Sequence, residues 1–279
     1  MTTPEITHQI LDDSVETLLV PLYIRAIESQ RPDALLKDET AVALVQQLDY
    51  DFSRIKQDRI ADETQVAILL RNREFDRYTR DFLARYPQAV VVHIGCGLDA
   101  RFERVDNGQV EWYDLDLPGV IGLRRKLLGG EKERYHLLAC SVLDNEWLKV
   151  VSAENRSAHR QRRFLFLAEG VFMFLEEAQV RSLVLSLKEQ FPGAELVFDA
   201  FSPFFVWANN RRFNRSKIGA LCHWALKRGK DLERWGDGIR LLDEWFPFRC
   251  LEPRLGPVRW ARNIPVLAKT MGVFHYQLG

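Results

Sequence analysis

Hydrophobic residues in the first part of the chain recur at helical spacing. In residues 13–30 the apolar side chains fall three or four positions apart, and Pro21 is expected to interrupt the helix. A shorter helical pattern covers residues 38–48, and a longer one covers residues 58–86 until Pro87 ends it. This part of the chain is therefore predicted to be helical and to precede any strand.

From residue 89 onward short apolar runs alternate with helical stretches, which is typical of a parallel sheet covered by helices. We expect strands at residues 89–94, 110–115, 135–140, 163–168 and 195–200. Helices between these strands are indicated at residues 119–128, 145–151 and 178–190.

The remainder of the chain predicts an insertion and a closing pair of strands. Residues 202–240 are rich in Trp, Asn, Lys and Arg, which favours a helical insertion over sheet, whereas the apolar runs 246–251 and 266–278 suit an antiparallel pair. We find no repeat and no low-complexity linker, so one integrated domain is expected. Its parts are a helical cap (1–88), a cofactor-binding core (89–201), a lid insertion (202–242) and closing strands (243–279).

Composition excludes several classes of protein. The 279 residues contain 39 Lys plus Arg and 39 Asp plus Glu, so no global charge attracts nucleic acid or an anionic membrane. The start, M-T-T-P-E-I-T-H, has neither the basic residues nor the apolar run of a secretory signal. The four cysteines have no C-x-x-C spacing, which favours reduced cytosolic thiols over disulfides or a zinc site. We therefore expect a cytoplasmic protein without a metal.

A glycine turn follows the first expected strand. The sequence V-V-V-H-I-G-C-G-L-D-A breaks at Gly95 and Gly97, where missing side chains let backbone N–H groups approach a ligand, so both are candidate cofactor-binding residues. The next expected strand ends in D-L-D and delivers Asp114 or Asp116 about twenty residues later, where a ribose diol needs an acceptor. These features indicate a nucleoside-containing cofactor.

The same turn formally satisfies the dinucleotide fingerprint G-x-G-x-x-A, so a nicotinamide-dependent oxidoreductase is an alternative. Against it, the acid occurs twice on the second strand, as Asp114 and Asp116, and a long helical segment precedes the first strand. Enzymes that use S-adenosylmethionine have no pyrophosphate to hold and need no third glycine. Cys96, inside the turn, is interpreted as a small residue that fits a tight bend rather than as a nucleophile.

Five segments, in this order, carry a resemblance to a known family: R-N-R-E-F-D from Arg71, H-I-G-C-G-L-D-A-R from His93, Y-D-L-D-L-P from Tyr113, A-E-G-V-F-M-F from Ala168 and F-H-Y-Q-L from Phe274. Together they resemble the leucine carboxyl methyltransferase family, including its bacterial polyketide O-methyltransferase branch. The resemblance implies a class I methyltransferase fold of the α/β class: a doubly wound, mostly parallel, Rossmann-like sheet of seven strands with an N-terminal helical cap and a helical lid insertion. It also implies S-adenosylmethionine as the cofactor.

The resemblance assigns most of the cofactor site. Arg71 matches the arginine that holds the cofactor carboxylate, and a guanidinium fork suits that planar anion. Gly95 matches the glycine beneath the amino-acid moiety. Asp114 or Asp116 would take the ribose hydroxyls, and the family pattern favours Asp114. Glu169, directly after the fourth strand, matches an acid that faces both the cofactor and the acceptor.

The adenine end departs from the family pattern. Ser141 and Val142 stand where relatives often carry Asp-Leu, so a hydroxyl or a backbone amide would replace the carboxylate, or Asp144 would reach in. Ala100 and Asn72 stand where threonine is frequent, which weakens local hydrogen bonding but removes no charge. Ser141 and Val142 are therefore the candidate adenine contacts.

Several of these residues also have structural interpretations. Arg71 and Arg73 would suit the solvated face of a helix, and Asp116 would suit the cap of the following helix. His93 lies in the middle of a strand and is interpreted as a core histidine. Glu169, by contrast, is costly between two apolar runs unless it lies at the end of a strand with partners.

The insertion carries two further groups of residues with alternative interpretations. An aromatic cluster favours the core of a lid, with an acceptor pocket as the alternative: Phe201, Phe204, Phe205, Trp207 and Trp224. A basic run favours a solvated helix face, with attraction of an anionic acceptor as the alternative: Arg211, Arg212, Arg215 and Lys217.

The function favoured by these observations is S-adenosylmethionine-dependent O-methylation of a hydroxyl or carboxyl group on a small molecule. Glu169 is the candidate catalytic residue, orienting the acceptor, because the sulfonium is already an activated methyl donor and placement is the main task. The alternatives are methylation of a protein C-terminal carboxylate, a nicotinamide oxidoreductase, and a module that binds cofactor without catalysis. The acceptor and the oligomeric state stay open.

Overall fold

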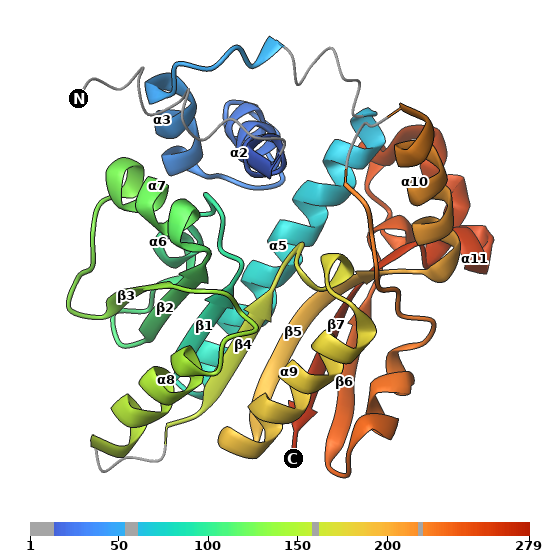
Figure 1. The fold of residues 1–279 in the computed structure, drawn as a ribbon. Coiled ribbons are helices and arrows are strands. Elements are labelled where there is room, and N and C mark those ends of the chain that lie inside the picture. Colours follow the sequence, from blue (N-terminus) through green and yellow to red (C-terminus); the bar gives the residue numbers. More distant parts are fainter. Residues whose placement is uncertain (1–13, 54–60, 158–161, 217–219) are drawn as a thin grey trace.

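The structure is a central sheet with helices on both faces (Figure 1). It is a computed structural model that describes residues 14–53, 61–157, 162–216 and 220–279. The sheet has seven strands in the order β3-β2-β1-β4-β5-β7-β6, in which β7 runs antiparallel to both of its neighbours and the other pairs are parallel. The strands are Val90–Ile94 (β1), Glu111–Asp116 (β2), Tyr135–Ala139 (β3), Phe164–Ala168 (β4), Ala194–Phe201 (β5), Ile239–Trp245 (β6) and Met271–Leu278 (β7).

The helices connect and cover these strands. Three precede the sheet: Ser14–Ser29 (α2), Glu39–Gln47 (α3) and Asp62–Arg85 (α5). The others follow in chain order: Arg101–Val105 (α6), Pro118–Leu128 (α7), Glu146–Ser157 (α8), Glu177–Gln190 (α9), Pro203–Ser216 (α10) and Pro265–Ala268 (α11). Short 3-10 helices complete the fold: Phe172–Phe174 (η1), Gly229–Trp235 (η2), Pro247–Arg249 (η3) and Pro253–Asn263 (η4). No helix within the described ranges is both long and apolar enough to cross a membrane.

Alternate residues of the strands face two separate cores. On β1, Val90, Val92 and Ile94 pack with the buried residues of α8 and α9, whereas Val91 packs with those of α5, α6 and α7. This alternation follows from the two-residue repeat of a strand. Since both faces are covered, β1 and β4 are apolar along most of their length, as expected for parallel strands inside an α/β fold.

The structure confirms the predicted fold class and corrects three details. The apolar run at 246–251 does not form a strand: η3 lies there, and the strand is the preceding β6. As an edge strand β6 buries few of its residues, so its sequence has no clear apolar pattern. The expected insertion at 202–240 is helical in α10 and η2 but ends inside β6, and a further helical segment, η4 and α11, precedes β7.

The third correction concerns Pro21, which does not interrupt the first helix. It lies inside α2, which runs unbroken from Ser14 to Ser29. The expected starts of the first and third helices, at residue 13 and at 58–60, fall outside the described residues. The division of the chain into cap, core, insertion and closing strands stays a prediction.

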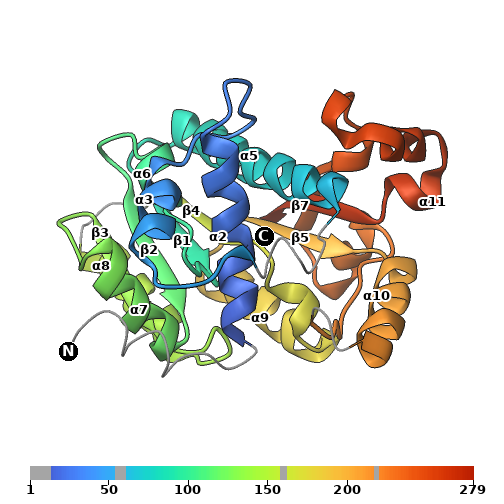
Figure 2. The same ribbon diagram turned by 90° about the horizontal axis from the view of Figure 1, so that it is seen from above.

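The N-terminal helices lie over the carboxyl ends of the strands, close to the glycine turn (Figure 2). Arg25 of α2 donates a hydrogen bond of 3.0 Å to the carbonyl of Leu98. Leu18 of the same helix lies so close to Gly97 that a Cβ there would stand 3.2 Å from its Cδ2. The turn is therefore packed from above by the cap as well as held by the sheet below.

The turn after β1 requires glycine at its first position for two separate reasons. Gly95 has a φ of 65°, in the left-handed region that residues with a Cβ rarely adopt. A Cβ at this position would also overlap Cγ2 of Val171, in the loop after β4. Backbone conformation and close packing thus both exclude a side chain where the two strand-end loops meet.

We expect Gly95→Ala to lower the free energy of unfolding by more than the cost of a left-handed alanine, which is about 1–2 kcal/mol. Gly108→Ala is the matched control, because Gly108 has a φ of 78° but a methyl group added there would have no atom within 4 Å. Adding Val171→Ala to Gly95→Ala should recover part of the loss. Urea unfolding of the wild type, the two single variants and the double variant measures these differences. Equal losses of unfolding free energy in Gly95→Ala and Gly108→Ala would show that contact with Val171 has no energetic effect.

Candidate active site

The residues expected to form a site meet at the carboxyl ends of the parallel strands. Gly95 follows β1, Asp116 ends β2, Ser141 lies shortly after β3, and Glu169 follows β4. Helix α5 packs against one face of the sheet (Figure 1), and from it Arg71 reaches Glu169 at the end of β4. In open α/β sheets this edge is where ligands bind, because loops there diverge and leave a crevice.

Arg71 joins α5 to two strand ends. Its Nε donates to Oε1 of Glu169 at 2.9 Å, and its Nη1 donates to Oδ2 of Asp199 on β5 at 2.8 Å. The Nη2 atom makes no hydrogen bond within the described part of the chain and lies beside Gly170. The side chain is 10% exposed, and two of the three guanidinium nitrogens are held by carboxylates.

Glu169 is the centre of a cluster of donors. Besides Arg71, its carboxylate accepts from Nη2 of Arg101 at 2.5 Å and from the side-chain amide of Asn72. Burial alone would raise the pKa of Glu169, but the charges of Arg71 and Arg101 outweigh it and lower the pKa below the ordinary value. The carboxylate is therefore ionised at neutral pH.

Arg101 connects Glu169 to further buried charges. It is fully buried, and its Nε donates to Asp76 on α5 at 2.8 Å. Asp99, in the glycine turn, pairs with Arg101 at 3.1 Å and with Arg104 at 2.8 Å. The charge of Arg104 keeps the pKa of Asp99 well below its usual range, against the opposing effect of burial. Each buried charge thus has opposite charges around it, which is the condition for burial at tolerable cost.

Asp116 and Asp114 differ sharply in their surroundings. Asp116 is partly exposed at the end of β2, where its Oδ2 accepts the N–H of Gly97 at 2.8 Å and its Oδ1 accepts the N–H of Leu117 at 2.7 Å. Burial raises the pKa of Asp116, although these two N–H groups act in the opposite direction. The side chain of Asp116 therefore lies against the backbone of the glycine turn and is partly open to solvent.

Asp114 is buried and fully engaged inside the fold. Its Oδ1 accepts the indole N–H of Trp112 at 2.8 Å, and its Oδ2 accepts the hydroxyl of Tyr135 at 2.6 Å together with Arg124. Arg124 in turn donates to the carbonyls of Gly97 and Asp99 at 2.8 and 2.9 Å. Both oxygens of Asp114 thus already accept hydrogen bonds inside the fold and the residue is 1% exposed, so its contact with the ribose stays a prediction.

The segment expected at the adenine is a turn closed by its own side chains. The backbone N–H of Ser141 donates to Asp144 at 3.1 Å, and the hydroxyl of Ser141 accepts the N–H of Leu143 at 3.2 Å. The carbonyl of Val142 accepts the indole N–H of Trp147 at 3.1 Å. Both Ser141 and Val142 are partly exposed beside the end of β3, so their cofactor contact stays a prediction.

Other residues of the cluster were not identified from the sequence as site residues: Asn72, Arg101, Arg124 and Asp199. A signal existed for Asp199, since an acid near the end of a buried strand resembles the case of Glu169. For Arg101 the sequence allowed a binding role and an ion pair with Asp99 equally, whereas Arg124 gave no signal, because arginine on a helix is ordinarily solvated. Two structural interpretations made from the sequence agree with the structure. His93 is a buried core residue near Asp114, and Cys96 is not activated as a nucleophile, because burial raises its pKa well above the ordinary value.

The residues present fit a nucleoside cofactor that carries a carboxylate. The backbone at Gly95 admits no Cβ, and the carboxylate of Asp116 lies at the strand end. Among the described residues Nη2 of Arg71 has no hydrogen-bond partner, so it can bind an anion. The oxygen of the Asn72 side chain is also buried without a partner within the described residues. This combination offers an anion contact, a close backbone approach and a diol acceptor along one edge of the sheet.

Comparisons with known proteins identify the family of the chain. The sequence model of the leucine carboxyl methyltransferase family matches residues 19–187. The chain is 35% identical over 232 residues to the tetracenomycin polyketide synthesis O-methyltransferase TcmP of Streptomyces glaucescens, covering 82% of each protein. It is 28% identical over 267 residues to the S-adenosyl-L-methionine-dependent methyltransferase dpfgK of Gibberella zeae, covering 90% of this chain and 87% of that one.

Solved structures share the fold at low sequence identity. A DUF574 family protein from Streptomyces avermitilis superimposes with a TM-score of 0.60 at 13% identity, covering 94% of this chain and 97% of that one. Magnesium protoporphyrin IX methyltransferase from Synechocystis PCC 6803, with bound S-adenosylhomocysteine, gives a TM-score of 0.50 at 10% identity, covering 87% and 100%.

The oxidoreductase alternative is not supported. The reversed β7 inserted between β5 and β6 differs from the parallel 3-2-1-4-5-6 order of dinucleotide-binding folds. The resemblance noted in the sequence is confirmed, and S-adenosylmethionine is the cofactor. The chain is an S-adenosylmethionine-dependent methyltransferase that belongs to the leucine carboxyl methyltransferase family.

Proposed function

We propose that the protein transfers a methyl group from S-adenosylmethionine to a hydroxyl or carboxyl oxygen of a small molecule. The observation that carries this proposal is the arrangement of Arg71, Gly95 and Asp116 along one edge of the sheet. The 35% identity to an O-methyltransferase of polyketide synthesis favours a small acceptor over the protein carboxylate that the family name suggests. We further propose that the enzyme is cytoplasmic, since its cysteines have no disulfide or zinc spacing, and that it binds neither nucleic acid nor membrane, since positive and negative charges balance.

The cofactor would lie along the carboxyl ends of the strands. Its carboxylate would bind Nη2 of Arg71, and its amino-acid moiety would pass over the backbone of Gly95 and Gly97. Its ribose hydroxyls would donate to Asp116, which the N–H of Gly97 already holds in place. In this assignment Asp114 does not contact the cofactor. It holds Arg124, which donates to the carbonyls of the turn and so supports the turn's conformation.

The bound sulfonium supplies an activated methyl group, so the task of the protein is placement and exclusion of water. Glu169 holds Arg71 and Arg101 with both oxygens, and we propose that it positions Arg71 instead of taking a proton from the acceptor. Its lowered pKa makes it a weak base. A carboxylate acceptor needs no base, whereas a hydroxyl acceptor would lose its proton to another group.

Calorimetric titration tests the proposed function directly. The purified protein should bind S-adenosylmethionine and S-adenosylhomocysteine and should not bind NADH. Incubation of metabolite extracts with labelled S-adenosylmethionine should then place label on a small molecule. Binding of NADH alone would refute the methyltransferase assignment. Label on protein C-termini would show that the acceptor is a protein carboxylate and not a small molecule.

Arg71→Gln should weaken the binding of both S-adenosylmethionine and S-adenosylhomocysteine by about tenfold or more, since both molecules carry the carboxylate. The same change leaves Glu169 and Asp199 with one cation fewer, so its unfolding free energy must be measured as well. Arg71→Lys keeps the charge but loses the fork and should still bind weakly. Arg73→Gln, an exposed arginine on the same helix, is the control and should bind as the wild type does. Unchanged affinity in folded Arg71→Lys and Arg71→Gln would remove Arg71 from the site.

The two aspartates of β2 should give opposite results. Asp116→Asn should weaken binding of S-adenosylhomocysteine by about tenfold, because a charged acceptor for the ribose is lost, and should lower the unfolding free energy by only about 1 kcal/mol, because one of the two backbone N–H groups loses its acceptor. Asp114→Asn should lower the unfolding free energy by about 3 kcal/mol or more, because Arg124 loses its buried counter-charge. Calorimetry and urea unfolding on both variants decide the matter: the reverse pattern would restore Asp114 as the ribose ligand.

A further inference from the structure

Two buried arginines bind successive carbonyl oxygens of the glycine turn. Nη1 of Arg124 donates to the carbonyls of Gly97 and Asp99 at 2.8 and 2.9 Å. Nη2 of Arg25 donates to the carbonyl of Leu98, which lies between them in the chain, at 3.0 Å. Because a peptide unit is planar, a carbonyl held in this way also fixes the N–H group of the following residue. The two arginines therefore set the direction in which the turn presents its N–H groups.

These arginines come from different parts of the fold. Arg124 lies on α7, which connects β2 to β3, whereas Arg25 lies on α2, which precedes the sheet and lies over the carboxyl ends of the strands (Figure 2). The side chain of Arg25 is 3% exposed, and its Nε donates to Oδ2 of Asp38 at 2.9 Å. Asp38 caps α3, where its Oδ1 accepts the N–H of Ala41 at 2.9 Å. One guanidinium thus joins both N-terminal helices to Leu98 of the turn.

Leu98 is also held through its side chain. It is buried in an apolar cluster that includes residues of both helices: Leu19, Leu22 and Ala26 of α2, with Ala41 and Leu44 of α3. The main chain and the side chain of Leu98 are therefore held by the same two helices. A displacement of these helices would expose an apolar side chain and free the carbonyl at the same time.

A second ionic connection joins the N-terminal helices to the turn. Oδ2 of Asp38 also accepts from Nη1 of Arg104 at 2.9 Å, and the same Nη1 donates to Oδ1 of Asp99 at 2.8 Å. Both Asp38 and the side chain of Arg104 are buried. Separation of α3 from the turn would remove Asp38 from Arg104, which is costly for buried charges. We therefore expect the helices and the turn to move as one unit.

We propose that Arg25 is a positioning residue for S-adenosylmethionine. It does not touch the cofactor, but it holds the glycine turn in the conformation that binds it. The N-terminal helices α2 and α3 are then part of the cofactor site, although they precede every strand. The assignment rests on the placement of the cofactor over Gly95 and Gly97 proposed above. Because coupling between two equilibria is reciprocal, the bound cofactor must in turn stabilise the docked position of α2.

Two variants of Arg25 separate positioning from support of the fold, with S-adenosylhomocysteine titrated by calorimetry and urea unfolding measured on the same proteins. Arg25→Lys keeps a cation beside Asp38 but lacks the fork that also reaches Leu98. It should bind S-adenosylhomocysteine about tenfold more weakly while it keeps most of its unfolding free energy. Arg25→Gln should lose affinity by about tenfold or more and stability as well, because Asp38 loses a buried counter-charge.

Hydrogen exchange measured by mass spectrometry reports on the turn itself. In folded Arg25→Lys the amide groups of residues 95–100 should exchange faster than in the wild type, whereas those of β1 should keep their protection. In the wild type, saturating S-adenosylhomocysteine should slow exchange both in residues 95–100 and in α2. The slowing in α2 should be smaller in Arg25→Lys, because the contact that couples the helix to the turn is lost.

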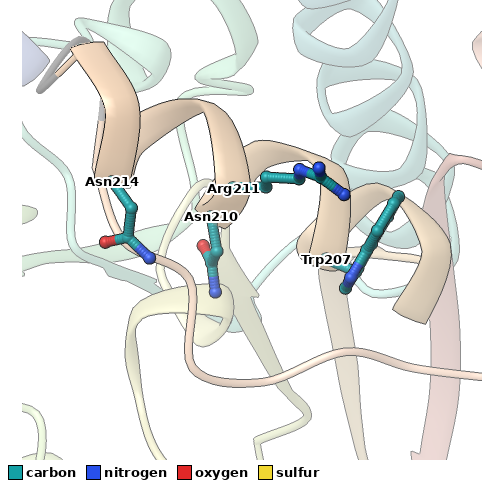
Figure 3. A pocket seen from close by; sticks show the side chains of 4 residues that line it. All are labelled: Trp207, Asn210, Arg211 and Asn214. Carbon is teal, nitrogen blue, oxygen red and sulfur yellow. The ribbon is translucent and has the colours of Figure 1, made fainter.

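Two arginines that form no bond with the glycine turn within the described residues are the matched controls. Arg31, after the end of α2, pairs with Asp33 on the surface at 3.0 Å. Arg31→Gln and Arg211→Gln should bind S-adenosylhomocysteine as the wild type does and should keep wild-type exchange in residues 95–100. Figure 3 shows Arg211 on α10, in a surface hollow lined by four residues of that helix: Trp207, Asn210, Arg211 and Asn214.

Each contrary result has a distinct meaning. Unchanged affinity of both folded Arg25 variants for S-adenosylhomocysteine overturns the assignment of Arg25. So does a loss of affinity in Arg25→Lys without faster exchange in residues 95–100. Wild-type protein that binds S-adenosylhomocysteine without slower exchange in residues 95–100 overturns the placement of the cofactor over the turn, and the assignment of Arg25 with it. Failure of the wild type to bind S-adenosylhomocysteine overturns the proposed function itself.

Discussion

Pairing of buried arginines with buried carboxylates is the constraint on which the site depends. Arg71, Arg101 and Arg124 each connect a helix to the strand-end loops, and none of them can lose its partner without leaving a charge in the interior. Such pairs contribute little net stability compared with apolar packing, but their geometry is demanding. We infer that they fix the positions of the loops around the cofactor, which packing of flexible apolar side chains would specify less sharply.

This network also explains how a chain of zero net charge maintains a strongly charged interior. Glu169 lies between Arg71 and Arg101, and Asp99 lies between Arg101 and Arg104, so positive and negative groups alternate through the cluster. Alternation lets each ion stabilise its neighbours and lowers the pKa of most of the acids despite burial. Asp199 is the exception: burial raises its pKa, and the like charge of Glu169 adds to the effect of burial.

Most strands of the sheet could be predicted from the sequence, because strands that are buried on both faces appear as apolar runs. It failed at β6 because an edge strand needs few buried residues, and at 246–251 because Phe246 packs on Phe274 without joining the ladder. The strand pattern itself did not separate Asp114 from Asp116, since residues two apart on a strand share a face, and the preference for Asp114 came from the family resemblance. What separates them is Tyr135 and Arg124, which are distant in sequence and reach only the inner residue.

The hydrogen bonds that the Glu169 carboxylate already accepts bear on the chemistry of the acceptor. A carboxylate that already accepts from Arg71, Arg101 and Asn72 would have to break at least one of these bonds to take a proton. Protonation would also remove the counter-charge that holds Arg71, so acid–base work at Glu169 would disturb the residue assigned to the cofactor. The two roles oppose each other. An acceptor that arrives as an anion avoids the conflict, because its oxygen is nucleophilic without help and Glu169 can remain ionised throughout.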